Sequence, residues 1–448
     1  MSKRWHTHVF TSTYTADVSG VCSAMYELGG MTILHDPSGC NSTYTTHDEP
    51  RWYDTDSLMF VSGLDEMTAV MGDDSVIIAD AVRAAEDLKP RFITLCGASI
   101  PHIIAFDFKG VARMIEKKTG IPVIPVATDG LKSYVSGVGL ATREWIRRFG
   151  DRTLLPAETS GAGGASGEGA SGKDGTTESG TGVSEERLRR LREYGVNLLG
   201  VTPIDFSRMD NVNALKKVFT DAGIPINTCF AMGDSFENLQ KVYRGAVNMV
   251  VSSAGRIPAR YLMGTAGIPW VEGLPVGPYM AEKILQALEE TARDGICRRV
   301  EEEEHGGPCR GEEAWGKLPG GMQEAECKAA VPGRVLIIGE EVFARSLAMA
   351  LNAGTLLREQ DLRAEALWPD VDEGLDEDML MEAVNASRYV IGDPLFRTVL
   401  RNPETKLIPF PHEGYSGRIF RKDIPVFAGA GFEPEAWLAE AFPGFDTK

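Results

Sequence analysis

Long apolar runs and an excess of positive charge are both missing from this sequence. No apolar run reaches the roughly 18–20 residues that a membrane-spanning helix needs, and no apolar signal region follows residues 1–6. Lys and Arg number 46 against 64 Asp and Glu, which leaves a formal net charge of −18. Because phosphate binding needs clustered basic side chains, this balance argues against a nucleic-acid partner. The sequence therefore predicts a cytoplasmic protein with neither a membrane nor a nucleic acid as partner.

Cysteine is also sparse, with seven in 448 residues. An odd number at irregular spacing argues for reduced thiols over a disulfide framework. The gaps of 18 and 56 residues between Cys22, Cys40 and Cys96 do not suit a zinc knuckle, which pairs its cysteines closely. A phosphate-binding loop is missing too, since no strand precedes residues 169–173 and Asp174 stands where Ser or Thr would bind magnesium. The chain itself is therefore not expected to bind ATP.

What is present is the pattern of an α/β protein. The content of 43% hydrophobic and 25% charged residues fits a globular chain of two or three domains. Helical patterns cover residues 76–88, 111–118, 212–222, 256–263 and 342–351, and β-type runs cover 91–95, 123–127, 196–201, 225–230, 248–253 and 334–339. This alternation predicts βαβ units, and hence Rossmann-like parallel sheets.

Two segments of unusual composition divide the chain. Residues 161–182 hold nine glycines and no large apolar side chain, which predicts a flexible linker. Residues 293–332 are acidic and Gly-rich and carry Cys297, His305, Cys309 and Cys327; a solvated connector is favoured there over a metal site. The predicted organisation is a first domain at 1–154, a linker at 155–184, a second domain at 185–292, a connector at 293–332 and a third domain at 333–448.

Three of the cysteines stand where a parallel sheet presents ligands. Cys22 is expected to open a helix, Cys40 to lie in the loop just beyond a strand, and Cys96 to end a strand. Open α/β sheets bind ligands at the carboxyl ends of their strands, and thiolates select iron–sulfur clusters or zinc. We therefore predict that Cys22, Cys40 and Cys96 share a metal site, most simply a 4Fe–4S cluster that takes a fourth ligand from elsewhere. The alternative is a zinc or cluster-free protein in which the three thiols are structural.

The run from Cys22 to Cys40 resembles the first two cluster cysteines of nitrogenase component 1 subunits. Segments 64–67, 90–96, 121–130, 196–200 and 267–270 resemble later parts of that family, in the same order. The resemblance implies three α/β units around a central cleft in a dimer or tetramer. It also implies an oxidoreductase that receives electrons from an ATP-dependent iron protein through an interfacial 4Fe–4S or P-cluster-like centre. A second copy, a paralogous subunit or a carboxylate such as Asp36 would complete the cluster.

Residues 411–423 are similar to the family's stretch that carries the histidine ligand of the large nitrogenase cofactor, with Glu413 interrupting the match. We predict that His412 is a catalytic histidine that donates protons in the cleft; the alternative is an ordinary loop histidine. The cofactor cysteine is missing, because residues 250–256 read Val-Val-Ser-Ser-Ala-Gly-Arg. Serine does not replace a soft thiolate on iron. This favours a nitrogenase-like reductase of a tetrapyrrole or a small molecule over a dinitrogen-reducing subunit.

Three further expectations stay open at this point. Arg256 and Arg260 lie on one helical face and either pair with carboxylates of an anionic substrate or form a solvated face, which is favoured. Cys229 either faces the same cleft or, as favoured, is a half-buried thiol at a strand end. The family also contains scaffolds on which a metallocluster is assembled before transfer, and this is the alternative to a reductase.

Overall fold

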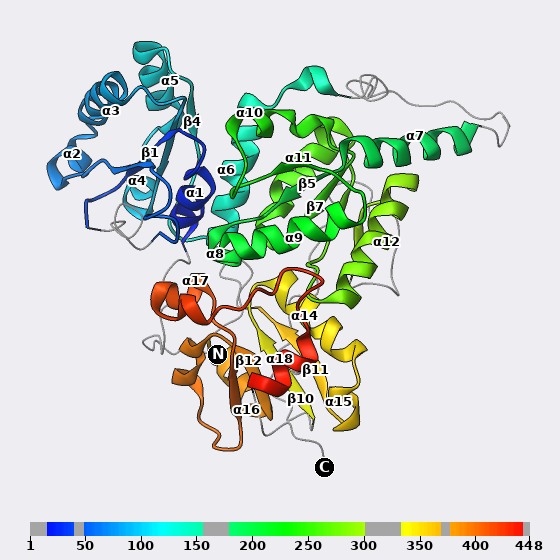
Figure 1. The fold of residues 1–448 in the computed structure, drawn as a ribbon. Helices are drawn as coiled ribbons and strands as arrows, with labels where there is room; N and C mark the ends of the chain where they lie inside the picture. Colours follow the sequence, from blue (N-terminus) through cyan, green and yellow to red (C-terminus); the bar gives the residue numbers. More distant parts are fainter. Residues whose placement is uncertain (1–15, 40–48, 156–178, 301–332, 369–376, 442–448) are drawn as a thin grey trace, which may run out of the picture.

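The protein folds into three α/β units, each built on one parallel sheet (Figure 1). A computed structural model describes residues 16–39, 49–155, 179–300, 333–368 and 377–441. In Figure 1 the first two units lie side by side and the third lies across from both of them. The predicted mixed α/β fold with three parallel-strand sheets is confirmed, whereas the domain boundaries themselves stay predictions.

The first unit carries a four-stranded sheet in the order β2-β1-β3-β4. Its strands are β1 Met31–His35, β2 Leu58–Val61, β3 Ile93–Gly97 and β4 Val123–Pro125. Its helices are α1 Asp17–Met25, α2 Glu66–Met71, α3 Ser75–Leu88, α4 Ser99–Ile103, α5 Phe108–Thr119 and α6 Tyr134–Phe149, followed by the 3₁₀ turn η1 Arg152–Leu154. β1 and β3 are neighbours with Leu34 opposite Cys96, so both strands end at one edge of the sheet.

The second unit has a five-stranded sheet in the order β6-β5-β7-β8-β9. Its strands are β5 Val196–Leu199, β6 Ile226–Cys229, β7 Val247–Val250, β8 Trp270–Glu272 and β9 Arg298–Arg299. Its helices are α7 Ser179–Tyr194, α8 Pro203–Phe206, α9 Met209–Asp221, α10 Phe236–Leu239, α11 Arg256–Ala266 and α12 Pro278–Asp294, with 3₁₀ turns η3 Gln240–Arg244 and η4 Ser253–Gly255. The strands are fully buried apart from the edges β6 and β9, as expected for a sheet covered by helices.

The third unit repeats the pattern with the order β11-β10-β12-β13. Its strands are β10 Arg334–Ile338, β11 Arg363–Leu367, β12 Tyr389–Gly392 and β13 Lys406–Pro409. Its helices are α14 Glu341–Ala353, α15 Leu356–Glu359, α16 Glu377–Ala386, α17 Glu413–Ser416 and α18 Pro434–Ala441, with 3₁₀ segments η6 Pro394–Val399 and η7 Gly417–Asp423. One apolar core continues from the second unit into the third, and Val276 bridges Gly429 between them.

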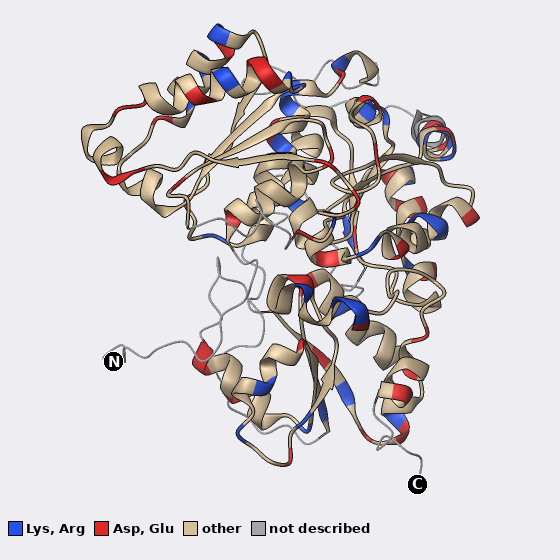
Figure 2. Ribbon diagram, turned by 60° about the vertical axis from the view of Figure 1, so that its left-hand side comes forward, with Lys and Arg blue, Asp and Glu red and all other residues tan. Residues whose placement is uncertain are grey.

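Charged side chains lie mainly on the helices and connecting loops (Figure 2). Within the described ranges, no helix combines the length and the hydropathy that crossing a bilayer requires.

Helices α1 and α6 cross at very short range because glycine faces each helix at the crossing. A Cβ on Gly20 would lie 2.0 Å from the carbonyl oxygen of Tyr134, and a Cβ on Gly137 would lie 1.8 Å from that of Asp17. Neither backbone has room for a methyl group. This crossing fixes α1, the helix that carries Cys22, against α6.

We expect Gly137→Ala to lower the free energy of unfolding by about 1–3 kcal/mol, because overpacking forces the two backbones apart. Gly264→Ala in α11 is the matched control, since its Cβ would meet nothing within 4 Å. Removing a helical glycine there should instead stabilise the protein by roughly 0.5–1 kcal/mol. Urea unfolding followed by circular dichroism measures both, and equal effects would contradict the close crossing.

Candidate functional site

Cys22 and Cys96, which are far apart in sequence, meet inside the first unit. Cys96 is the fourth residue of β3, near its carboxyl end, as expected. Cys22 lies in the second turn of α1, because that helix begins at Asp17. The prediction that Cys22 opens a helix is therefore wrong, and no helix N-terminus stabilises its thiolate. Both side chains are fully buried in one apolar cluster.

The surroundings of the two thiols are polar at one point only. A hydrogen bond with Cys22, together with burial, raises the pKa of Cys96 well above its usual range. The Asp17 carboxylate accepts from the backbone N–H groups of Asp129 and Gly130, each at 2.9 Å. Burial raises the pKa of Asp17 to about 6, although these backbone bonds oppose the shift. Without a metal, the pair is thus held as thiols.

Cys40 lies outside the described residues, so its position stays a prediction. β1 ends at His35 beside β3, so the described chain at 36–39 continues from the sheet edge that holds Cys96. Asp36 is buried there, and its charge contributes to the raised pKa of Cys96. The described residues contain no group of three potential metal ligands. They supply two soft donors to a cluster, and the chemistry of those donors suits iron or zinc.

A second polar cluster lies where the three units meet. The Tyr134 hydroxyl at the start of α6 donates to Asp205 Oδ1 at 2.5 Å, and His412 Nε2 lies 3.4 Å from the same oxygen. The Glu340 carboxylate accepts from the Ser253 hydroxyl at 2.5 Å and from the Ser253 backbone N–H at 2.8 Å. All three units therefore contribute an ionisable or hydroxyl side chain to one buried junction.

The proton affinities of this junction are shifted toward neutral pH. Burial, with the charge of Asp205, raises the pKa of Glu340 to about 7. Burial alone lowers the pKa of His412, but Asp205, Asp393 and Glu340 raise it above its ordinary value. The Gly414 N–H donates to His412 Nδ1 at 3.0 Å, so the proton of the neutral ring sits on Nε2. That nitrogen lines the cavity between the units.

The cavity itself is small. It offers about 10 Å³ to the centre of a water molecule, which is room for roughly one water. Asp205, Ser252, Glu340 and His412 supply its polar lining, the other lining residues are apolar, and no cysteine is among them. The Ser253 side chain, near which the family's cofactor subunit has a cysteine, is committed to Glu340. A large metallocofactor ligated by His412 and a thiolate therefore does not fit this junction.

Comparison with known proteins decides the family. The model of the nitrogenase component 1 type oxidoreductases matches residues 20–356. The chain belongs to this family. A solved structure of nitrogenase Cp1 at pH 6.5 superposes with a TM-score of 0.62 over 99% of this chain and 95% of that chain. Its sequence identity is 12%, so this likeness concerns the fold alone.

Relatives in sequence include one of the subunits of light-independent protochlorophyllide reductase. The protein from Synechococcus sp. (strain JA-3-3Ab) is 29% identical over 107 residues, which cover 24% of this chain and 21% of that protein. The protein from Chlorella vulgaris is 27% identical over 106 residues, covering 23% and 21%. The match thus spans about a fifth of the length of these relatives.

The other candidates of this nitrogenase-family chain have structural surroundings. Arg256 is buried and paired with Glu272 and Glu341, so both expectations for it, substrate pairing and a solvated face, are wrong. Arg260, one turn further along α11, is exposed. Cys229 is a fully buried core residue at the end of β6, and burial raises its pKa to about 12.

Sequence reasoning missed three members of the junction: Tyr134, Asp205 and Glu340. Two of them had a local signal. Thr202 caps α8 by accepting from the Asp205 N–H, in the pattern of Thr followed three residues later by an acid. Glu340 follows β10 directly and caps α14 through the Phe343 N–H. Such signals place a helix start, but they do not show that two helix starts face each other.

The raised pKa of Glu340 predicts a pH-dependent stability. Between its ordinary value of 4.5 and about 7, the folded protein keeps a proton that the unfolded chain has lost. Its stabilising effect is therefore complete below pH 4.5 and lost as the pH rises through 7. Because Gln mimics the protonated acid, Glu340→Gln should match the wild type near pH 5. It should then exceed the wild type near pH 8 by on the order of 1–3 kcal/mol in chemical denaturation.

The other charged groups that face Glu340 are Asp205 and His412. Glu289→Gln, an exposed member of a surface ion pair, is the control and should give no such pH-dependent difference. A constant difference between the Glu340→Gln variant and the wild type at all pH values would contradict the shift.

Proposed function

We propose that the protein is a nitrogenase-like reductase component. It receives single electrons from an ATP-dependent iron protein through an iron–sulfur cluster bound at Cys22, Cys40 and Cys96. A second copy or a paralogous subunit supplies the remaining ligand. The observation that carries the proposal is the contact between the thiols of Cys22 and Cys96, at the sheet edge from which the chain runs toward Cys40. Membership of the family supports the same reading.

Two side chains of the described region would hold the cluster, and Cys40 would add a third. When bound, the cluster supplies one-electron transfer at a potential that hydrogen bonds and solvent exposure tune. The chain contributes a dry pocket, since both cysteines are fully buried, and a fixed α1–α6 crossing that holds Cys22 in place. The buried Asp17 carboxylate adds a negative charge nearby, which contributes to the raised pKa of Cys96.

Reduction also consumes protons, and the junction of the three units is suited to supply them. His412 Nε2 faces the cavity and Asp205, while Glu340 has a pKa of about 7 and so exchanges protons near neutrality. A group of the substrate would accept the proton from His412 Nε2. In this conformation the cavity does not hold a tetrapyrrole, so a substrate of that size requires the third unit to move away from the other two.

Oxygen-free preparation of the protein tests the proposal. We expect a coloured protein with iron and acid-labile sulfide in equal amounts, whose visible absorbance bleaches when a reduced iron protein of this family and Mg-ATP are added. Zinc in place of iron, or colourless protein, would overturn it. Bleaching without ATP would overturn the part that concerns the electron donor.

A second candidate is a scaffold for metallocluster assembly, and the closed cavity favours it because a scaffold needs no substrate site. The two functions differ in stoichiometry. A reductase turns over many equivalents of electrons with the iron protein and ATP, whereas a scaffold releases its cluster once to an apo-acceptor. Sustained ATP-dependent electron uptake would exclude the scaffold.

A further inference from the structure

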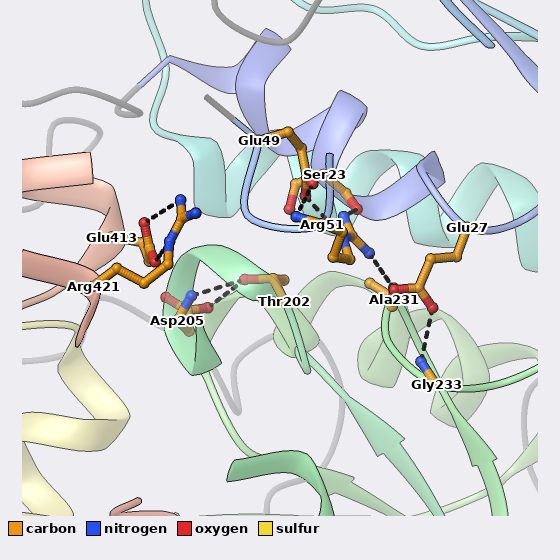
Figure 3. A network of polar contacts seen from close by, with 10 residues as sticks. All are labelled: Ser23, Glu27, Glu49, Arg51, Thr202, Asp205, Ala231, Gly233, Glu413 and Arg421. Atoms are coloured by element: carbon orange, nitrogen blue, oxygen red, sulfur yellow. Dashed lines mark hydrogen bonds and ion pairs between the residues drawn. The ribbon is translucent and has the colours of Figure 1, made fainter. Parts of the chain in front are cut away.

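Arg51 is a buried guanidinium that joins four parts of the chain (Figure 3). It is 5% exposed. Its Nε donates to Glu49 Oε1 at 2.8 Å, and its Nη1 donates to Glu27 Oε1 at 2.9 Å. The remaining two bonds go to backbone carbonyl oxygens, from Nη1 to Ala231 at 2.9 Å and from Nη2 to Ser23 at 2.8 Å. A planar fork with several donors suits this arrangement, and an ammonium does not.

The bond to Ser23 acts on the helix that carries Cys22. α1 ends at Met25, so the Ser23 carbonyl is among the last four of the helix and needs a partner outside the helical ladder. A cation there also offsets the negative end of the helix dipole. The guanidinium carbon lies 4.8 Å from the centre of the Tyr26 ring, in a cation–π contact one residue beyond the helix. Arg51 thus caps α1 close to Cys22.

The other bonds tie α1 to the second unit. Ala231 has a positive φ of 94°, a conformation that costs energy for any residue but glycine. Its carbonyl is held by Arg51, and the nearby Gly233 N–H donates to Glu27 Oε2 at 2.9 Å. Glu27 therefore bridges Arg51 and the 231–233 loop. None of these residues touches the three-unit junction at His412.

We propose that Arg51 is a positioning residue for Cys22, holding α1 at its carboxyl end against the second unit so that the Cys22 thiol stays in place beside Cys96. The inference rests on the proposed function only in giving that position a purpose. The position itself is testable in metal-free protein.

The first test measures thiol alkylation in the metal-free protein, read site by site by mass spectrometry. We expect Arg51→Lys to accelerate alkylation of Cys22 by roughly tenfold or more through local opening of α1, with Cys229 unchanged. Arg256→Lys is the matched control, because it also alters a buried arginine with two carboxylate partners but does not touch α1. Equal acceleration at Cys22 and Cys229, or the same Cys22 rate in both variants, would overturn the proposal.

Glu27→Ala is the second variant, in case Arg51→Lys does not fold. It removes the bridge to Gly233 but leaves the Arg51–Glu49 pair intact, so it should accelerate Cys22 alkylation with a smaller loss of stability. No acceleration in a folded Glu27→Ala variant would count against the proposal.

In iron-loaded protein, Arg51→Lys should change the electron paramagnetic resonance spectrum and the midpoint potential of the cluster, and Arg256→Lys should leave both unchanged. A wild type without iron would overturn the proposed function, yet the alkylation result would still decide the role of Arg51. An unchanged spectrum and potential in Arg51→Lys would overturn that role for the loaded protein.

Discussion

Replacing Cys22 or Cys96 by Ala should lower the iron bound to anaerobically purified protein by roughly tenfold or more. Loss of an outer hydrogen-bond partner already costs about 10–100-fold in metal affinity, and loss of a thiolate ligand removes a metal bond outright. The two cysteines are in contact, so each single variant should abolish the same centre. Iron and sulfide analysis, with the visible absorbance, measures the effect.

Cys229→Ala is the matched control for these variants. Cys229 is 1% exposed and also sits at the end of a buried strand, so its loss costs similar packing, but it lies in the core of the second unit. Its iron content should equal that of the wild type. Iron that persists in Cys22→Ala and Cys96→Ala, or that falls equally in Cys229→Ala, would remove the basis for a cluster at this site.

The meeting of Cys22 and Cys96 follows from features that a sequence carries well. β3 is a short apolar run stopped by Gly97, and parallel strands place such ends at one edge. The expected start of α1 is wrong because Gly20 does not mark a helix entry. In the structure Gly20 is a contact point for α6 within the helix, and the acidic residue of the first turn, Asp17, marks the start.

The junction of three units is beyond local reasoning. A family resemblance points to His412, but its partners Asp205 and Tyr134 come from the second and first units. Their pairing depends on how whole units pack, which no periodicity records. The size of the cavity likewise follows from the packing of Phe206, Phe343 and Phe427 around it.

Arg256 and Arg260 make the same point, since the two look alike in sequence. They lie one turn apart on α11, yet Arg256 is 9% exposed and Arg260 is on the surface. The difference arises because the start of α11 lies against α14 of the third unit, where Arg256 Nη1 donates to Glu341 at 2.6 Å. A contact between residues 85 apart decides what the helix face alone leaves open.

Arg256→Ala should destabilise the protein by about 3 kcal/mol, the low end of the 3–5 kcal/mol expected when one partner of a buried ion pair is removed. Burial alone would raise the pKa of Glu272, but Arg256 and Arg299 hold it below its ordinary value, so this carboxylate is charged. Arg299 lies 3.2 Å from Glu272 and Arg345 3.5 Å from Glu341, so neither acid loses every cation. This residual pairing keeps the cost at the low end. Denaturant unfolding near neutral pH measures it.

Arg260→Ala on the same helix is the control and should change the free energy of unfolding by no more than about 0.5 kcal/mol, as surface substitutions do. A loss of about 3 kcal/mol is a large share of the 5–15 kcal/mol that stabilises a typical domain, so the Arg256 variant should unfold at clearly lower denaturant. If the two variants unfold together, Arg256 is not the ion that joins the second and third units. An Arg256→Ala variant that keeps its iron while losing this stability would separate the inter-unit contact from the cluster site.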